Sequence, residues 1–129
     1  MDNADIRILL VDDELDFTQP MCFWLKSKGY SVMVANGGEA ALAAIKEQAP
    51  TIVFMDLNMP VMDGTTTLKK IREFNKDVPV IIISSYVDDK RIVEATPYGV
   101  SGVFYKGGDF QEGLTLLESA LRTHRQLKK

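Results

Sequence analysis

Acidic, hydroxyl and ammonium side chains recur in this chain at the points where apolar stretches stop. Asp12 and Asp13 follow the first stretch, Asp56 ends another, and Ser84 and Lys106 close the last two. Carboxylates brought close together repel one another, so burying them requires a neutralising cation. Oxygen ligands of this kind suit Mg2+, which binds one or two carboxylates and shares a phosphate oxygen with its substrate.

Asp56 is the central carboxylate of this set, and a carboxylate can attack phosphorus as a nucleophile to form an acyl phosphate. In such a transfer the metal ion and Lys106 would balance the charge on the phosphoryl oxygens, and the Ser84 hydroxyl would donate to one of them. Each residue alone could be an ordinary loop, cap or surface residue. The set as a whole predicts phosphoryl transfer onto Asp56.

Five apolar stretches have the length and composition of buried strands, and segments with helical apolar spacing separate them. The stretches span residues 6–11, 30–35, 51–56, 79–84 and 102–106. Strands that are apolar on both faces and alternate with helices predict a doubly wound α/β fold, in which a parallel sheet lies between helices. Phe17, Trp24, Met33 and Met55 are expected in the core. In such a sheet, ligands bind outside the carboxyl ends of the strands, where the polar residues named above would converge.

The bulk composition suits one domain spanning residues 1–129. The chain has 46% hydrophobic and 26% charged residues, which is average for a globular domain. A formal net charge of -3 argues against direct binding to nucleic acid. One cysteine, Cys22, an N-terminus without a signal-peptide pattern and apolar runs too short for a membrane span predict a cytoplasmic location.

Four motifs in the expected order resemble the receiver domain of two-component response regulators, over essentially the whole chain. They are VDDE at 11–14, DLNMPVMDG at 56–64, PVIIISS at 79–85 and the lysine at 106. The resemblance implies a flavodoxin-like (βα)5 fold with a five-stranded parallel sheet of order 2-1-3-4-5. It also implies a phosphorylation-dependent signalling switch that uses Mg2+ and catalyses only its own phosphorylation and dephosphorylation.

The same resemblance assigns a role to each matching residue. Asp56 would be the phosphoacceptor, Asp13 a direct Mg2+ ligand, and Asp12 a ligand acting mainly through metal-bound water. Asn58 would offer its backbone carbonyl to the metal. Ser84 would be the switch hydroxyl that moves toward the phosphoryl group.

Lys106 would be the cation of the site. The phosphoryl donor would be a sensor histidine kinase or a phosphotransfer protein. The output would reach a downstream effector domain or protein through the face built by the fourth helix, fifth strand and fifth helix, and phosphorylation could drive dimerisation.

Several positions depart from the family pattern. Val103 stands where receivers usually carry an aromatic residue, and Phe104 and Tyr105 should point differently because side chains alternate along a strand. Gly107 and Gly108 follow the lysine where the family commonly has a proline, so this loop gains flexibility. These departures predict a modified route of output.

Two prolines bear on the helices. Pro97 is expected to end the fourth helix early. Pro20 would lie inside a helix running from Glu14 to Lys28, at a cost of about 3 kcal/mol. A later start with Thr18 as N-cap, or a kink at Pro20, is therefore predicted.

Other functions compete with the signalling switch. A pseudo-receiver that acts as a constitutive interaction module is motivated by Val103 and the two glycines. An aspartate-nucleophile phosphatase would place a second Asp where this chain has Asn58. A flavin-binding reading of the same topology is disfavoured because an acidic rim repels a cofactor phosphate. Whether the chain is a stand-alone receiver or a piece of a longer protein stays open.

Overall fold

The computed structural model of the chain, which describes residues 3–86 and 89–127, contains one five-stranded parallel sheet. Its strands are β1 (Arg7–Val11), β2 (Ser31–Ala35), β3 (Ile52–Asp56), β4 (Val80–Ser84) and β5 (Gly102–Tyr105). They lie in the order β2-β1-β3-β4-β5, and every neighbouring pair is parallel. The predicted doubly wound, flavodoxin-like topology is therefore confirmed.

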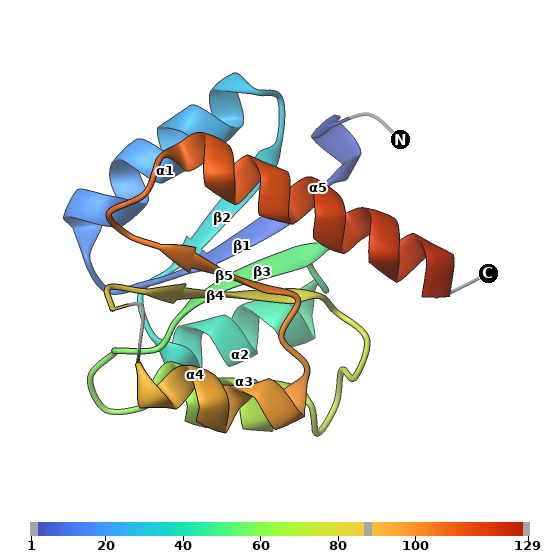
Figure 1. The fold of residues 1–129 in the computed structure, drawn as a ribbon. Coiled ribbons are helices and arrows are strands. Elements are labelled where there is room, and N and C mark those ends of the chain that lie inside the picture. The colour runs from blue at the N-terminus through green and yellow to red at the C-terminus, as the bar shows by residue number, and fades with distance from the viewer. Residues whose placement is uncertain (1–2, 87–88, 128–129) are drawn as a thin grey trace.

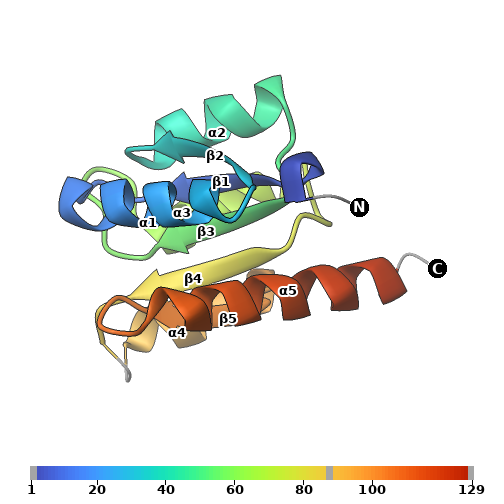
Figure 2. The same ribbon diagram turned by 90° about the horizontal axis from the view of Figure 1, so that it is seen from above.

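Helices cover both faces of the sheet. They are α1 (Leu15–Ser27), α2 (Gly38–Glu47), α3 (Gly64–Ile71), α4 (Lys90–Ala95) and α5 (Phe110–Leu127), with short 3-10 turns η1 (Asn3–Asp5) and η2 (Thr96–Tyr98). Figure 1 shows α1 and α5 on one face and α2, α3 and α4 on the other, and Figure 2 looks down on the α1 and α5 side. Within the described residues, no helix combines the length and apolar character needed to cross a bilayer.

Each face of the sheet carries its own apolar core. On the α1 and α5 side, Phe17, Phe54 and Phe104 belong to one buried cluster. On the opposite side, Val53 and Met55 belong to a second cluster. Neighbouring residues of β3 thus face opposite cores, as the alternation of side chains along a strand requires. All five residues of β3 and all five of β4 are buried, as predicted for central strands of a parallel sheet.

The strand β2 is less buried than predicted. Only Ala35 of its five residues is buried, whereas Met33 and Val34 are 55% and 40% exposed. The expectation that Met33 fills the core is wrong. The physical reason is that β2 lies at the edge of the sheet, with a neighbour on one side only.

The first helix tolerates its internal proline. It begins at Leu15, directly after Glu14 as N-cap, so the predicted later start with Thr18 as N-cap is wrong. Pro20 cannot donate to the carbonyl of Asp16 four residues earlier, but both residues are exposed and water can bind that carbonyl. Pro97 behaves as predicted, because α4 ends at Ala95 and the proline lies in the η2 turn that follows.

The loop from β3 to α3 is held by close packing at one end and strained at its tip. Gly64 opens α3, and a Cβ atom added there would lie 2.2 Å from the carbonyl oxygen of Asp56. Asp63 caps the helix by accepting a hydrogen bond of 2.8 Å from the backbone N–H of Thr66. At the tip, Val61 is fully exposed and has a positive φ of 68°, a conformation that β-branched residues rarely adopt.

We expect Gly64→Ala to lower the free energy of unfolding by about 1–3 kcal/mol, because the new methyl group overlaps the end of β3. Urea denaturation followed by circular dichroism measures the change. The matched control is Gly107→Ala, since a Cβ there meets no atom within 4 Å and the backbone φ is not positive. Equal stability of the two variants would contradict the close approach.

Candidate functional site

Three carboxylates meet at the carboxyl edge of the sheet. One carboxylate oxygen from each of Asp12, Asp13 and Asp56 lies within 4.8 Å of the other two. Asp12 and Asp13 follow β1, and Asp56 ends β3, the strand paired with β1. Asp12 and Asp56 are buried, whereas Asp13 is exposed. The predicted convergence of these residues is therefore observed.

The two buried carboxylates are oriented in the same way. The backbone N–H of Glu14 donates to Oδ1 of Asp12 at 2.9 Å, and the N–H of Asn58 donates to Oδ1 of Asp56 at 3.2 Å. Each contact joins a carboxylate to the N–H two residues later, which fixes the side chain to its own loop. The Asp56 Oδ2 atom is buried and accepts no hydrogen bond from any described residue. A buried carboxylate oxygen that accepts no hydrogen bond is a position that favours a cation.

Lys106 supplies the positive charge of the site. Its Nζ lies 2.9 Å from Oδ2 of Asp12 and 3.5 Å from Oδ2 of Asp56, and it also donates to Glu14. The ammonium lies over the ring of Phe17, 5.2 Å from the ring centroid. Burial lowers the pKa of Lys106, but hydrogen bonds to Glu14 and Asp12 outweigh it and raise the pKa to about 12. The lysine therefore stays charged at neutral pH.

Burial raises the pKa of Asp56 to about 7, and the neighbouring charge of Asp12 adds to the shift. The charge of Lys106 and the Asn58 N–H act in the opposite direction but do not cancel it. The free carboxylate is thus poorly solvated and only partly neutralised. Additional positive charge beside it would stabilise its ionised form.

Ser84 lies at the predicted place, buried at the end of β4, but its hydroxyl is bonded away from Asp56. Its Oγ lies 2.9 Å from the carbonyl oxygen of Tyr86 and 3.3 Å from Oδ2 of Asp89, and it accepts from the Tyr86 N–H at 3.2 Å. The side chain of Asp89 in turn accepts from the Arg91 guanidinium, a hydrogen bond that holds the pKa of Asp89 below its ordinary value.

Sequence reasoning missed three residues of this neighbourhood. Glu14, one of the ion-pair partners of Lys106, belongs to the VDDE motif, so its position beside the acidic pair was the available signal. Asp89 and Arg91 lie beyond the PVIIISS motif, and no spacing in the sequence marks them. Asn58 is exposed, and it contacts the site by donating its backbone N–H to Asp56.

Val103, which stands where receivers usually carry an aromatic residue, packs against an apolar core. Val103 packs against the buried cluster on the α2, α3 and α4 side, while Phe104 belongs to the cluster under α1 and α5. The predicted opposite orientation of Phe104 is thus confirmed. Alternation returns Tyr105 to the Val103 side of the strand, so its predicted different orientation does not follow.

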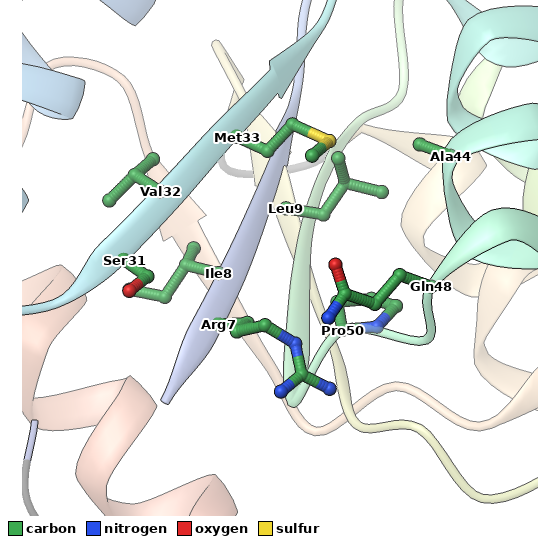
Figure 3. A pocket seen from close by; sticks show the side chains of 9 residues that line it. All are labelled: Arg7, Ile8, Leu9, Ser31, Val32, Met33, Ala44, Gln48 and Pro50. Atoms are coloured by element: carbon green, nitrogen blue, oxygen red, sulfur yellow. The ribbon is translucent and has the colours of Figure 1, made fainter. Parts of the chain in front are cut away.

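A cavity of about 230 Å³ lies elsewhere, between β1, β2 and α2. Figure 3 shows Leu9, Met33 and Gln48 beside it, with Arg7 at one end. The Arg7 guanidinium already donates to the carbonyl of Ala49 at 2.7 Å. Because Arg7 begins β1 and Asp12 follows its end, this cavity is separate from the acidic cluster.

Comparison with known proteins identifies the family. The family model described as the response regulator receiver domain matches residues 8–118. The transcriptional regulatory protein ZraR of Escherichia coli strain K12 is 37% identical over 125 residues, which cover 96% of this chain and 28% of ZraR. The regulatory protein AtoC of the same strain is 32% identical over 123 residues, which cover 95% of this chain and 27% of AtoC.

Solved structures agree with these sequence matches. NtrX from Brucella abortus has a TM-score of 0.88 and 29% identity, covering 95% of this chain and 28% of the NtrX chain. The Vibrio cholerae chemotaxis protein CheY4 has a TM-score of 0.84 and 26% identity, covering 89% of this chain and 98% of CheY4.

The chain thus spans 28% of the length of ZraR, whereas it matches nearly all of CheY4. Receiver domains act as signalling switches of two-component systems and are not enzymes in the ordinary sense. The chain belongs to the response regulator receiver domain family.

Proposed function

We propose that this chain is a phosphorylation-dependent switch that accepts a phosphoryl group on Asp56 with the help of Mg2+. The observation that carries the proposal is the buried Asp56 Oδ2, which has no hydrogen-bond donor among the described residues and lies 3.5 Å from the Lys106 ammonium. A carboxylate in that position has both a free oxygen for attack and a cation beside it.

The acidic cluster fits a hard divalent cation. Asp13 and Asp56 would bind Mg2+ directly, Asp12 mainly through a metal-bound water, and Asn58 through its backbone carbonyl. The close approach of the three carboxylates supports this assignment, because oxygen ligands suit Mg2+ and a cation offsets their repulsion. When bound, Mg2+ supplies positive charge to the oxygens of the transferring phosphoryl group.

The transfer forms a bond between an Asp56 carboxylate oxygen and phosphorus. On a phosphohistidine donor, the phosphorus–nitrogen bond breaks and its electron pair stays on the imidazole. Lys106 stabilises the negative charge on the phosphoryl oxygens during this step, and the Ser84 hydroxyl then donates a hydrogen bond to one of them. Hydrolysis of the acyl phosphate by water, which the domain itself catalyses, resets the switch.

The partners follow from this role. The donor is a sensor histidine kinase or a phosphotransfer protein. The receiver of the signal is an effector domain or protein that contacts the face of α4, β5 and α5, and phosphorylation-dependent dimerisation through that face stays a prediction. The constitutive pseudo-receiver is not supported, because the acidic cluster and its lysine are complete despite Val103 and the two glycines.

Treatment with beryllium fluoride and Mg2+ should form a one-to-one adduct on Asp56, detected by fluorine-19 NMR. Removing Mg2+ with a chelator or introducing Asp56→Asn should abolish the adduct, since both the nucleophile position and the cation are required. An adduct that forms equally in Asp56→Asn, or none in the unmodified protein, contradicts the proposal.

The pH dependence of stability provides a second test. The pKa of Asp56 is about 7 in the folded, metal-free chain against an ordinary value of 3.8, so the folded state binds more protons between these values. Its contribution is fully present below pH 4 and is lost as the pH rises through 7. Asp56→Asn should therefore match the unmodified protein near pH 3.5 and exceed its stability at pH 8, by about 2–4 kcal/mol.

Urea denaturation in chelator at both pH values measures this difference. Saturating Mg2+ should shrink it at pH 8, because the cation stabilises the ionised carboxylate. A gap that is independent of pH would show that Asp56 is not neutralised by burial.

Lys106→Met should slow phosphorylation by a small phosphodonor about 100-fold or more, because the transition state loses a buried positive charge. Single-turnover labelling with phosphoramidate measures the rate. Lys70→Met, at an exposed lysine in the last turn of α3, is the matched control and should keep the rate of the unmodified protein. Equal rates for both variants would remove Lys106 from the chemistry.

A further inference from the structure

The Ser84 hydroxyl is held on the side of the loop that precedes α4. Among the described residues of that loop, three polar groups contact its Oγ: the carbonyl of Tyr86 at 2.9 Å, the N–H of Tyr86 at 3.2 Å and Oδ2 of Asp89 at 3.3 Å. No hydrogen bond links Ser84 to Asp56 in the described part of the chain. The hydroxyl must therefore leave these contacts before it can reach a group bound to Asp56.

Asp89 cannot easily turn away from Ser84, because Arg91 holds it from two directions. The backbone N–H and Nε of Arg91 both donate to Oδ1 at 3.0 Å, and Nη2 donates to Oδ2 at 2.9 Å. The side chain of Asp89 is only 7% exposed, against 31% for Arg91. A bidentate guanidinium contact fixes a carboxylate more rigidly than a single hydrogen bond does.

A serine hydroxyl carries one proton and can donate to one acceptor at a time. The Tyr86 carbonyl and Asp89 Oδ2 are both acceptors, so they compete with any phosphoryl oxygen for that proton. A phosphoryl group on Asp56 adds about 1.5–2 negative charges beside the loop and so repels the Asp89 carboxylate. Charge as well as distance therefore determines which acceptor binds the Ser84 hydroxyl.

We propose that Asp89 is a positioning residue that, oriented by Arg91, retains the Ser84 hydroxyl in the loop before α4 and so opposes its transfer to phosphorylated Asp56. The proposal rests on the phosphoacceptor role proposed for Asp56. It makes the first turn of α4 part of the switch, because the same carboxylate caps that helix.

Asp89→Asn separates this role from simple helix capping. Asparagine keeps an oxygen that can accept from the Arg91 N–H, and it caps helices as well as aspartate does. It replaces the oxygen facing Ser84 and Nη2 of Arg91 by an NH2 group, which is a donor. The helix cap survives, while the acceptor for the Ser84 proton and the guanidinium pair are removed.

The test is a beryllium fluoride titration of the chain at saturating Mg2+, followed by fluorine-19 NMR. Asp89→Asn should bind the phosphoryl mimic about three- to tenfold more tightly, the range expected for one competing hydrogen bond. In a Ser84→Ala background, Asp89→Asn should give no such gain, because the proton to be released is absent. Asp77→Asn, an equal charge change at an exposed site before β4, should leave the affinity unchanged.

Unchanged affinity in Asp89→Asn, or an equal gain with and without Ser84, overturns the inference while leaving the adduct on Asp56 intact. Absence of any adduct in the unmodified chain overturns the proposed function. In that case, hydrogen exchange of the Tyr86 amide in metal-free protein decides the inference alone. Exchange several-fold faster in Asp89→Asn supports the restraint on Ser84, and equal exchange removes it.

Discussion

The site depends on burying two like charges beside one ammonium. Asp12 and Asp56 are both nearly inaccessible to solvent, and Lys106 reaches both of them. This arrangement requires β1 and β3 to be neighbours and the end of β5 to lie on the same edge of the sheet, which the order β2-β1-β3-β4-β5 provides. One cation cannot fully offset two buried carboxylates, so uncompensated negative charge remains at this edge of the sheet.

The two apolar cores support different parts of the site. The cluster under α1 and α5 includes Phe17, whose ring also carries the Lys106 ammonium, so this core supports the cation of the site directly. The cluster under α2, α3 and α4 includes Leu57 and Met59 and so supports the loop that follows β3. The central strands β3 and β4 are buried on both faces, so packing fixes the positions of their ends. The polar side chains at those ends are therefore held in fixed positions as well.

The sequence was sufficient for those features that depend on the spacing of apolar residues and on the residues at strand ends. The five strands, their parallel arrangement and the acidic cluster follow from apolar stretches that stop at polar residues. Sequence reasoning failed where the outcome depends on what surrounds a residue. Met33 is apolar yet exposed on an edge strand, and Pro20 lies on an exposed part of its helix together with Asp16. The Asp89–Arg91 pair could not be predicted because it depends on how two side chains orient at the start of α4.

Val61 gives the loop after Asp56 a property of its own. Its side chain is entirely in solvent, so no contact within the described protein compensates for a left-handed backbone that costs a non-glycine residue about 1–2 kcal/mol. Asparagine tolerates that conformation better, and could replace the valine without disturbing a neighbour. A substitution at residue 61 can therefore change the stability of the loop after Asp56 without changing any residue of the proposed metal site.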